Sequence, residues 1–394
     1  MTVVRPGNAE QARLLRLLRD HGPRSRAQLG DAVDLSRSKL AVEIERLVLR
    51  GLVDTAGLAA SRGGRRSSMV RIAGHTRFLG IDIGATSIDV AVTDGELRVL
   101  SHVAEPIDLR QGPEVVIGRA LELVGKLRAD DVAPGFVGAG VGLPGPVNFA
   151  EGVPVSPPIM PGWNHFPVRE TFAAELGCPV LVDNDVNIMA LGERHAGIAR
   201  SIDDFLFVKI GTGIGCGIVI GGQVYRGVSG CAGDIGHIRV EDSGPVCTCG
   251  NTGCLEAFFG GTALARDAVA AARSGESEHL ARQLARAGTL TAVDVAEAAA
   301  AGDPVAVAMA RDGGRRVGKV LAGLVSFFNP GLVVVGGGVA GIGHALLAEI
   351  RGVVYRRSPP LATGNMPIVL SELGADAGVV GAARLVSDHV FSAP

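Results

Sequence analysis

Three cysteines and one histidine have the residue types and the spacing of a complete metal site. The segment Cys247-Thr-Cys249-Gly-Asn-Thr-Gly-Cys254 places three thiols within eight residues, and His237 stands ten residues before the first of them. Three thiolates and one imidazole complete a tetrahedral shell around Zn²⁺, which is typical of a closed structural site. The alternative, ordinary core cysteines, does not explain why they cluster in a glycine-rich loop. The pattern therefore predicts structural Zn²⁺ bound by His237, Cys247, Cys249 and Cys254.

Two glycine-rich segments repeat one pattern of strand, turn, strand and turn. They begin at Phe78 and Phe205, align without gaps, and carry their first turns at residues 82–86 and 211–213. Such a repeat predicts two similar lobes that face one another. Glycines let backbone N–H groups approach phosphate oxygens, and the aspartate and threonine of the first turn suit hydrated Mg²⁺ and a phosphate oxygen. A plain glycine hairpin is the alternative for either turn alone, but the duplication favours a phosphate site.

A third glycine run, residues 336–338, follows the apolar segment Leu332 to Val335. It is either a surface beneath a nucleotide base or a simple turn at the end of a strand. The candidate nucleotide-binding residues are Asp82, Gly84, Thr86, Gly211, Thr212, Gly213, Gly336 and Gly337.

A carboxylate and an amide follow the apolar run Val180-Leu-Val182. In open α/β sheets the carboxyl ends of strands face the ligand. Asp185 there is a candidate base that accepts a proton from a substrate hydroxyl, and Asn184 is a candidate hydrogen-bonding partner of a neighbouring hydroxyl. The alternative is an Asx turn that caps the following helix.

The first 72 residues have the pattern of a winged helix-turn-helix. Residues 8–21 form an amphipathic helix, Ser25 and Gln28 form a capping box at the start of a second helix, and Ser36 caps a third helix that ends near Arg50. In this arrangement the third helix enters the DNA major groove. A strand, an arginine-rich tip and a return strand then form the wing, whose arginines suit a narrow minor groove. A solvated charged loop is the alternative for the wing alone. The candidate DNA-binding residues are Ser36, Arg37, Ser38, Lys39, Arg62, Arg65 and Arg66.

Charge is divided unevenly along the 394 residues. Residues 1–77 hold 15 Arg and Lys against 7 Asp and Glu, a net +8; the remainder holds 38 − 15 = 23 against 40 − 7 = 33, a net −10. A basic head on an acidic body points to an anionic partner for the head alone. We find no signal peptide, and the longest apolar stretch, residues 320–340, is broken by Asn329-Pro330 and predicts a helix end followed by a buried strand. A cytoplasmic protein without a membrane partner is expected, and there clustered cysteines favour a metal over a disulfide.

Seven motifs together resemble the ROK family (repressors, open reading frames and kinases), in its regulator form with an N-terminal winged helix. They are Asp82-Ile-Gly84-Ala-Thr86, Gly142-Leu-Pro-Gly-Pro146, Pro161-Gly-Trp-Asn164, Asn184-Asp185, Gly211-Thr-Gly-Ile-Gly215, Gly233-Asp-Ile-Gly-His237 and Cys247-x-Cys249-Gly-x-x-Gly-Cys254-Leu-Glu256. They span nearly the whole chain after residue 77, and the cysteine signature is the most specific of them.

The resemblance implies an α/β, actin-like and hexokinase-like fold of two lobes around a cleft. We expect residues 1–72 to be the DNA-binding domain, 73–77 a linker, 78–195 the first lobe and 196–394 the second, with a return of the C-terminal helix to the first lobe left open. The same zinc ligands are implied. The implied sugar-binding residues are Asn164, Asn184, Asp185, Asp234, His237 and Glu256, with Asp185 the catalytic base in kinase members.

Two positions depart from the family pattern. The family usually has glutamate where this chain has Asp234, and kinase members often have lysine where it has Ser87. Our first hypothesis is therefore a sugar-responsive transcriptional regulator, expected to be a repressor of carbohydrate-metabolism genes. It would act as a homodimer or homotetramer on operator DNA, with a sugar effector in the cleft. The second is an ATP-dependent sugar kinase, a phosphotransferase to an alcohol group that needs ATP and Mg²⁺, carrying a DNA-binding head. A DNA-binding scaffold with an empty cleft is the third.

Overall fold

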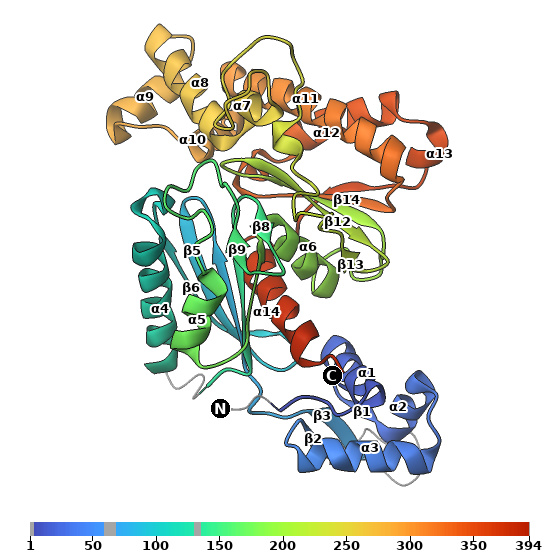
Figure 1. Ribbon diagram of the computed structural model, residues 1–394. Coiled ribbons are helices and arrows are strands. Elements are labelled where there is room, and N and C mark those ends of the chain that lie inside the picture. The colour runs from blue at the N-terminus through green and yellow to red at the C-terminus, as the bar shows by residue number, and fades with distance from the viewer. Residues whose placement is uncertain (1–3, 59–67, 130–134, 394) are drawn as a thin grey trace. The chain divides into compact units, whose positions relative to one another are not determined.

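The computed structural model describes residues 4–58, 68–129 and 135–393, and the chain divides into two compact units (Figure 1). The first unit takes Met1–Ser156, Met160–His195 and Gly378–Pro394, and the second takes Pro157–Ile159 and Ala196–Ala377. The C-terminal segment therefore belongs to the first unit, although the whole second unit precedes it in the sequence. None of the helices in the described ranges is long and apolar enough to cross a bilayer.

The head of the first unit consists of three helices and a small sheet with the strand order β1-β3-β2. The predicted capping box is confirmed: Ser25 Oγ accepts a hydrogen bond from Gln28 N, and the Gln28 side chain accepts one from Ser25 N at 2.9 Å. Leucines at helical spacing, such as Leu14, Leu18 and Leu40, are buried between the helices. The elements are α1 (Ala9–His21), β1 (Arg24–Ser25), α2 (Arg26–Val33), α3 (Arg37–Leu49), β2 (Val53–Leu58) and β3 (Ser68–Ile72).

The rest of the first unit is built on a five-stranded sheet with the order β10-β7-β4-β5-β6. β4 pairs antiparallel with β5 and parallel with β7, and β7 pairs parallel with β10. The strands are β4 (Phe78–Ile83), β5 (Ser87–Thr93), β6 (Val99–Pro106), β7 (Gly138–Leu143) and β10 (Val180–Asn184), with a ribbon of β8 (Val147–Asn148) and β9 (Val153–Pro154). The helices are η1 (Leu109–Gln111), α4 (Pro113–Ala129), α5 (Val168–Leu176), α6 (Asp185–His195) and α14 (Asp376–Val390).

Glycines allow α14 to lie directly on its neighbours. An added Cβ at Gly80 of β4 or Gly140 of β7 would lie 2.0 Å or 1.8 Å from backbone carbonyl oxygens of α14, so neither position can carry a side chain. On α14 itself, a Cβ at Gly381 would lie 1.6 Å from the carbonyl oxygen of Ile188 in α6. The last turns of α14 also contribute Val386, Val390 and other apolar side chains to the core of the head.

The second unit repeats the same sheet topology, with the order β13-β12-β11-β14-β15. β11 pairs antiparallel with β12 and parallel with β14, and β14 pairs parallel with β15, as in the first unit. The repeat seen in the sequence is therefore confirmed as a repeat of structure, and the expected α/β fold with two hexokinase-like sheets is present. The strands are β11 (Phe205–Ile210), β12 (Ile214–Ile220), β13 (Gln223–Val224), β14 (Leu332–Gly336) and β15 (Ile368–Leu370).

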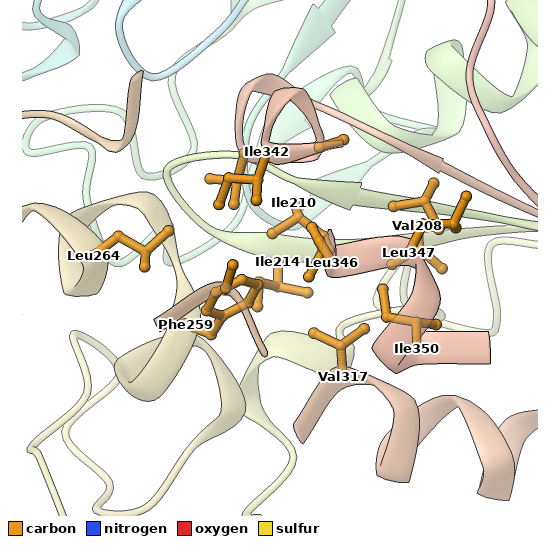
Figure 2. Packing of buried hydrophobic residues seen from close by; sticks show 14 of the residues in the cluster. Val208, Ile210, Ile214, Phe259, Leu264, Val317, Ile342, Leu346, Leu347 and Ile350 are labelled. Carbon is orange, nitrogen blue, oxygen red and sulfur yellow. The ribbon is translucent and has the colours of Figure 1, made fainter. Parts of the chain in front are cut away.

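Helices cover this second sheet with an apolar core. Figure 2 shows Val208 and Ile210 of β11 and Ile214 of β12 packed among side chains of the covering helices, such as Phe259 and Val317. The predicted helix end and buried strand over residues 320–340 are confirmed by α11 and β14. The helices are η2 (Ile235–His237), α7 (Leu255–Phe259), α8 (Gly261–Ser274), α9 (Glu278–Ala287), α10 (Ala292–Ala300), α11 (Pro304–Phe328), η3 (Gly338–Ile342), α12 (His344–Arg357) and α13 (Pro360–Thr363).

Candidate functional site

The cysteine-rich loop of the second unit brings its four predicted ligands together. The nitrogen and sulfur atoms of His237, Cys247, Cys249 and Cys254 all lie within 4.8 Å of one another. The short helix η2 holds the histidine, and an isolated antiparallel bridge between Val246 and Thr252 closes the loop.

The distances within this group fit a tetrahedral metal. A Zn–S bond of about 2.3 Å implies a separation of about 3.8 Å between two sulfur ligands. The Sγ atoms of Cys249 and Cys254 are 3.8 Å apart, and Cys247 Sγ lies 3.4 Å from His237 Nδ1. Burial, together with the neighbouring thiols, raises the pKa of the Cys254 thiol to about 12, so binding a cation must displace its proton.

The histidine of this group can serve two partners. Its Nδ1 atom faces the sulfurs, while its Nε2 atom lies 3.9 Å from Oδ1 of Asp234. The Asp234 side chain is 46% exposed and that of His237 is 23% exposed, so both are open to a solute. A carboxylate near the free nitrogen of a metal-bound imidazole fixes the tautomer and the orientation of the ring.

Glu256 connects the cysteine-rich loop to the second glycine turn. It lies in α7, two residues after Cys254, and its Oε2 accepts a hydrogen bond from Ile214 N at 3.0 Å. A Cβ at Gly213 would lie 2.4 Å from that same oxygen, so a side chain there would displace the Glu256 carboxylate. Glu256 therefore positions the turn at residues 211–213.

The first glycine turn joins β4 to β5. Gly84 N donates to the carbonyl of Ser87 at 2.8 Å, and the side chain of Thr86 is exposed. Asp82 is buried at the end of β4, and a Cβ at Gly378 would lie 1.9 Å from its Oδ2. The first turn of α14 therefore packs against this carboxylate.

Asn184 and Asp185 lie where β10 ends and α6 begins. The side-chain oxygen of Asn184 accepts from Val186 N at 2.9 Å, and its amide donates to the carbonyl of Gly145 at 2.9 Å. The Asx turn held open as an alternative is thus present, and it fixes the side chain of Asp185 as the first, buried residue of α6.

Asn164 lies in a separate exposed loop of the first unit. Its Oδ1 accepts a hydrogen bond from Ser156 N at 2.8 Å, while the neighbouring Trp163 is fully buried and donates to the carbonyl of Leu109. The side-chain oxygen of Asn164 is therefore used to shape its own loop.

The third glycine run is a tight turn at the end of β14. Gly337 has φ of +89°, and a Cβ there would lie 2.5 Å from the carbonyl oxygen of Ile210. A Cβ at Gly336 would lie 2.6 Å from the ring of Phe207. Close packing between β14 and β11 accounts for both glycines, as the strand-end alternative expects.

The predicted recognition helix α3 presents its first turn to solvent. Ser36, Arg37, Ser38 and Lys39 are all exposed, and Ser36 Oγ caps the helix by accepting from Lys39 N. The Nζ atom of Lys39 also donates to Oε1 of Glu10 in α1 at 2.7 Å, and this bond raises the pKa of the Lys39 ammonium group. The wing residues Arg62, Arg65 and Arg66 lie outside the described residues.

Sequence reasoning missed two of these contacts. Nothing in the spacing of Glu10 or Glu256 identifies their partners, because each contact joins segments 29 or 42 residues apart. Only the position of Glu10 in the first turn of α1 was a usable signal, since an acidic residue there is typical of a helix start.

Known proteins match this chain either over nearly its whole length or over about four-fifths of it. The xylose repressor of Caldicellulosiruptor bescii is 27% identical over 97% of this chain and 96% of its own length. A protein of Caldicellulosiruptor sp. (strain Rt8B.4), also named for xylose repression, is 30% identical over the same shares. The glucokinase of Halalkalibacterium halodurans is 33% identical but covers 79% of this chain and 95% of itself.

The solved structures that resemble this chain also match either nearly all of it or about four-fifths of it. The crystal structure of a ROK family transcriptional regulator, a homologue of the E. coli MLC protein, matches 97% of this chain and 96% of its own, with a TM-score of 0.80 and 26% identity. A ROK family glucokinase from Streptomyces griseus, in complex with glucose and AMPPNP, matches 78% of this chain and 98% of its own, with a TM-score of 0.70 and 33% identity. The family model described as the ROK family matches residues 78–389, and the chain therefore belongs to the ROK family.

Proposed function

We propose that this protein is a sugar-responsive DNA-binding transcriptional regulator that represses carbohydrate-metabolism genes. The observation that carries the proposal is how much of the chain each kind of relative matches. Proteins named as repressors or regulators match the chain from its head to its C-terminal helix, whereas the glucokinases match about four-fifths of it. The additional part is the basic head, which a kinase acting only on small molecules does not need.

The head would bind DNA through α3. Its exposed hydroxyl and cationic side chains suit phosphates and base edges in the major groove. A two-fold dimer would place two such helices on half-sites about one helical turn apart. Because cations on phosphates release condensed counterions, the affinity should fall steeply as salt rises.

The proposed sugar contacts are Asn164, Asn184, Asp185, Asp234, His237 and Glu256. Hydroxyl groups of a sugar are recognised by carboxylates, amides and an imidazole, and this set offers all three. The relatives are named for xylose and glucose, so an aldopentose or an aldohexose is the proposed effector class. A sugar can regulate DNA binding only if its affinity for the conformation that binds DNA well differs from its affinity for the conformation that binds DNA poorly.

The proposed metal is Zn²⁺, held by His237, Cys247, Cys249 and Cys254. It would supply a structural cross-link within the loop, and His237 would keep its Nε2 atom for Asp234 or a sugar hydroxyl. Elemental analysis should find about one zinc per chain, lost in Cys247→Ser. The exposed Cys231, which lies outside the group, provides the control Cys231→Ser.

A fluorescence titration tests the main proposal. A labelled duplex, enriched from a random library by repeated selection with the full chain, is titrated with protein with and without D-xylose or D-glucose. We expect one sugar to weaken the binding by about 5-fold or more and Asp185→Asn to abolish that effect. Operator affinity that stays the same across a panel of aldoses and N-acetylhexosamines would count against the proposal.

Sugar phosphorylation is a second candidate activity. Asp185 is fixed where the edge strand β10 meets α6, both glycine turns are formed, and the S. griseus glucokinase resembles this part of the chain. Ser87 and Asp234 depart from the kinase pattern, so we rank this activity second. ADP release with Mg²⁺, ATP and an aldose, abolished in Asp185→Asn, would establish it, and no turnover across the panel would remove it.

A further inference from the structure

We propose that helix α6 and a partly buried ion cluster connect the candidate sugar-binding residues to the DNA-binding head. The ion cluster consists of Arg19 and Asp20 at the end of α1 and Arg384 and Asp388 in the second half of α14. Figure 1 shows the end of α14 (red) beside the first helices of the chain (blue). This inference rests on the proposed function and specifies how the sugar signal reaches DNA.

The ion cluster joins the head to α14 through charges that share partners. The Arg19 side chain is fully buried; its Nη1 donates to Asp388 Oδ1 at 2.7 Å and to Ser387 Oγ at 2.9 Å, and its Nε donates to Asp20 at 2.8 Å. Arg384 donates to Asp388 at 3.0 Å and to Asp20 at 3.2 Å. Each arginine therefore contacts one aspartate from the head and one from α14.

This sharing restricts how the head can move. Two cations and two carboxylates balance one another only while α1 and α14 keep their present alignment. A buried charge that loses its partner is strongly unfavourable. The head is thus held in one orientation as long as the ion cluster is complete, and a change in the ion cluster changes that orientation.

His195, the last residue of α6, contacts both sides of the ion cluster. Its Nδ1 lies 3.2 Å from Arg384 Nη1 and 3.6 Å from Asp20 Oδ1, and its Nε2 lies 3.2 Å from the carbonyl oxygen of Glu96. Since a guanidinium can only donate, Nδ1 accepts and Nε2 carries the proton donated to Glu96. The end of α6 is therefore bonded to the cluster rather than only packed near it.

The other end of α6 carries the candidate sugar residues. Asn184 caps the helix, Asp185 is the first of its 11 residues, and His195 is the last. Such a helix is about 16 Å long and moves as one body. It crosses α14 at Gly381 with no side chain between the two backbones. A sugar that displaces the first turn of α6 therefore also displaces His195 and α14, and with them the ion cluster.

The experiment measures the coupling ratio, defined as the Kd for the selected duplex with saturating sugar divided by the Kd without it. D-xylose and D-glucose are the probes. His195→Gln keeps a polar side chain but cannot reproduce both ring contacts, and Arg384→Lys keeps the charge but not the forked geometry. Arg119→Gln is the control, because Arg119 pairs with Glu105 and Glu122 elsewhere in the unit.

We expect the wild type and Arg119→Gln to show a coupling ratio of about 5 or more. In His195→Gln and Arg384→Lys the ratio should fall toward 1, while the sugar still raises the melting temperature as it does in the wild type. The change in hydrogen exchange that the sugar causes, measured separately at α1 and at the first turn of α6, distinguishes a lost connection from a general loss of stability. Sugar should alter exchange of the amides of Ala9–His21 in the wild type but not in His195→Gln, whereas the first turn of α6 should respond in both.

The outcomes separate the two proposals. If the variants keep the wild-type ratio, the connection through α6 is wrong and the repressor function stands. If no sugar of the panel of aldoses and N-acetylhexosamines changes DNA binding by the wild type, the sugar-responsive function fails and this inference fails with it. If Arg384→Lys does not fold, His195→Gln, which alters no charged residue of the ion cluster, decides the question alone.

Discussion

Glu10 determines how much of the positive charge of α3 is free to meet DNA. Its carboxylate bonds the ammonium group of Lys39 at 2.7 Å, and both side chains are exposed to solvent. A phosphate must compete with this carboxylate for the same cation. The ion pair therefore opposes DNA binding without contributing much to the stability of the fold, as is usual for exposed pairs.

We predict that Glu10→Gln strengthens binding to any duplex at low salt. Removing the competing carboxylate frees Lys39, and Lys39→Gln should weaken binding and reduce the slope of log K against log salt by about 0.9, the contribution of one phosphate contact. Fluorescence anisotropy between low and moderate salt measures both. Lys126→Gln is a matched control, because Lys126 on α4 forms a similarly exposed pair with Glu105 of β6. An unchanged slope in Lys39→Gln would mean that this residue does not touch the DNA backbone.

Residue chemistry predicted which four Cys and His side chains come together but not every use of the other polar side chains. Four soft ligands close in sequence can form one site almost regardless of the surrounding fold, and here they do. Asn184 and Asn164 are different, because an amide can serve a ligand or its own backbone, and their side-chain oxygens accept backbone N–H groups. Which use applies depends on where the chain turns, and residue type alone does not contain that information.

At the scale of elements, the contact between α6 and α14 depends on a single missing side chain. Gly381 lies against the carbonyl of Ile188, where even a methyl group would overlap the backbone. Since overpacking of a well-packed core typically costs about 1–3 kcal/mol, we predict that Gly381→Ala destabilises the first unit by at least that amount. Thermal unfolding followed by circular dichroism measures the loss.

Gly125 provides the matched control for this substitution. It lies on the exposed side of α4, and an added Cβ would meet nothing within 4 Å. Gly125→Ala should therefore stabilise the protein by about 0.5–1 kcal/mol, because alanine favours a helix interior over glycine. Equal effects of the two substitutions would contradict the close packing of α6 on α14.

The end of α6 also predicts a pH dependence of stability. Burial, together with the nearby Arg384 and Arg19, lowers the pKa of His195, although Asp20 opposes the shift. The folded protein therefore keeps this imidazole neutral at pH values where the unfolded chain is already protonated. The unfolded state then binds more protons, so the free energy of unfolding falls as pH drops below about 6.5, by at most about 1.4 kcal/mol per pH unit for this group.

Melting temperatures between pH 7.5 and 5.5 test this prediction. His195→Gln should lose part of the decrease, and substitution of the exposed His344 by Gln should not. A remaining slope is expected because burial and Arg5 lower the pKa of His389 as well. A wild-type slope in His195→Gln would show that the buried neutral imidazole is not what destabilises the protein in acid.

Periodicity and caps predicted the elements of the head and both glycine hairpins, because those signals are local. The position of α14 could not be predicted in the same way. Glycines of β4 and β7 lie against backbone carbonyls of α14, and Gly381 of α14 lies against the carbonyl of Ile188 in α6. These partners are distant in sequence, so the fit appears only when the elements are already in contact. The family resemblance supplied the two-sheet fold, but the sequence left open whether the last helix joins the first sheet.

At the scale of the whole molecule, the C-terminal segment is part of the support of the head. Its apolar side chains share a core with Leu14, Leu15 and Leu18 of α1, and the ring of Phe391 packs edge-on to Phe78 at 5.6 Å between centroids. We predict that deleting residues 378–394 abolishes DNA binding and the cooperative unfolding of the first unit, measured by anisotropy and by calorimetry. Deleting residues 392–394 alone should leave both intact. DNA binding by the longer deletion at wild-type affinity would refute this dependence.

The return of α14 to the first unit also matters while the chain is being made. The head is complete in sequence after residue 72, but its partner Ser387 is added 387 − 72 = 315 residues later. At typical bacterial to eukaryotic elongation speeds this delay is roughly 15 to 60 s. A nascent polypeptide still attached to the ribosome therefore lacks α14, which supports its DNA-binding head. Premature termination before α14 is complete would yield fragments unable to occupy the promoter in place of the finished protein.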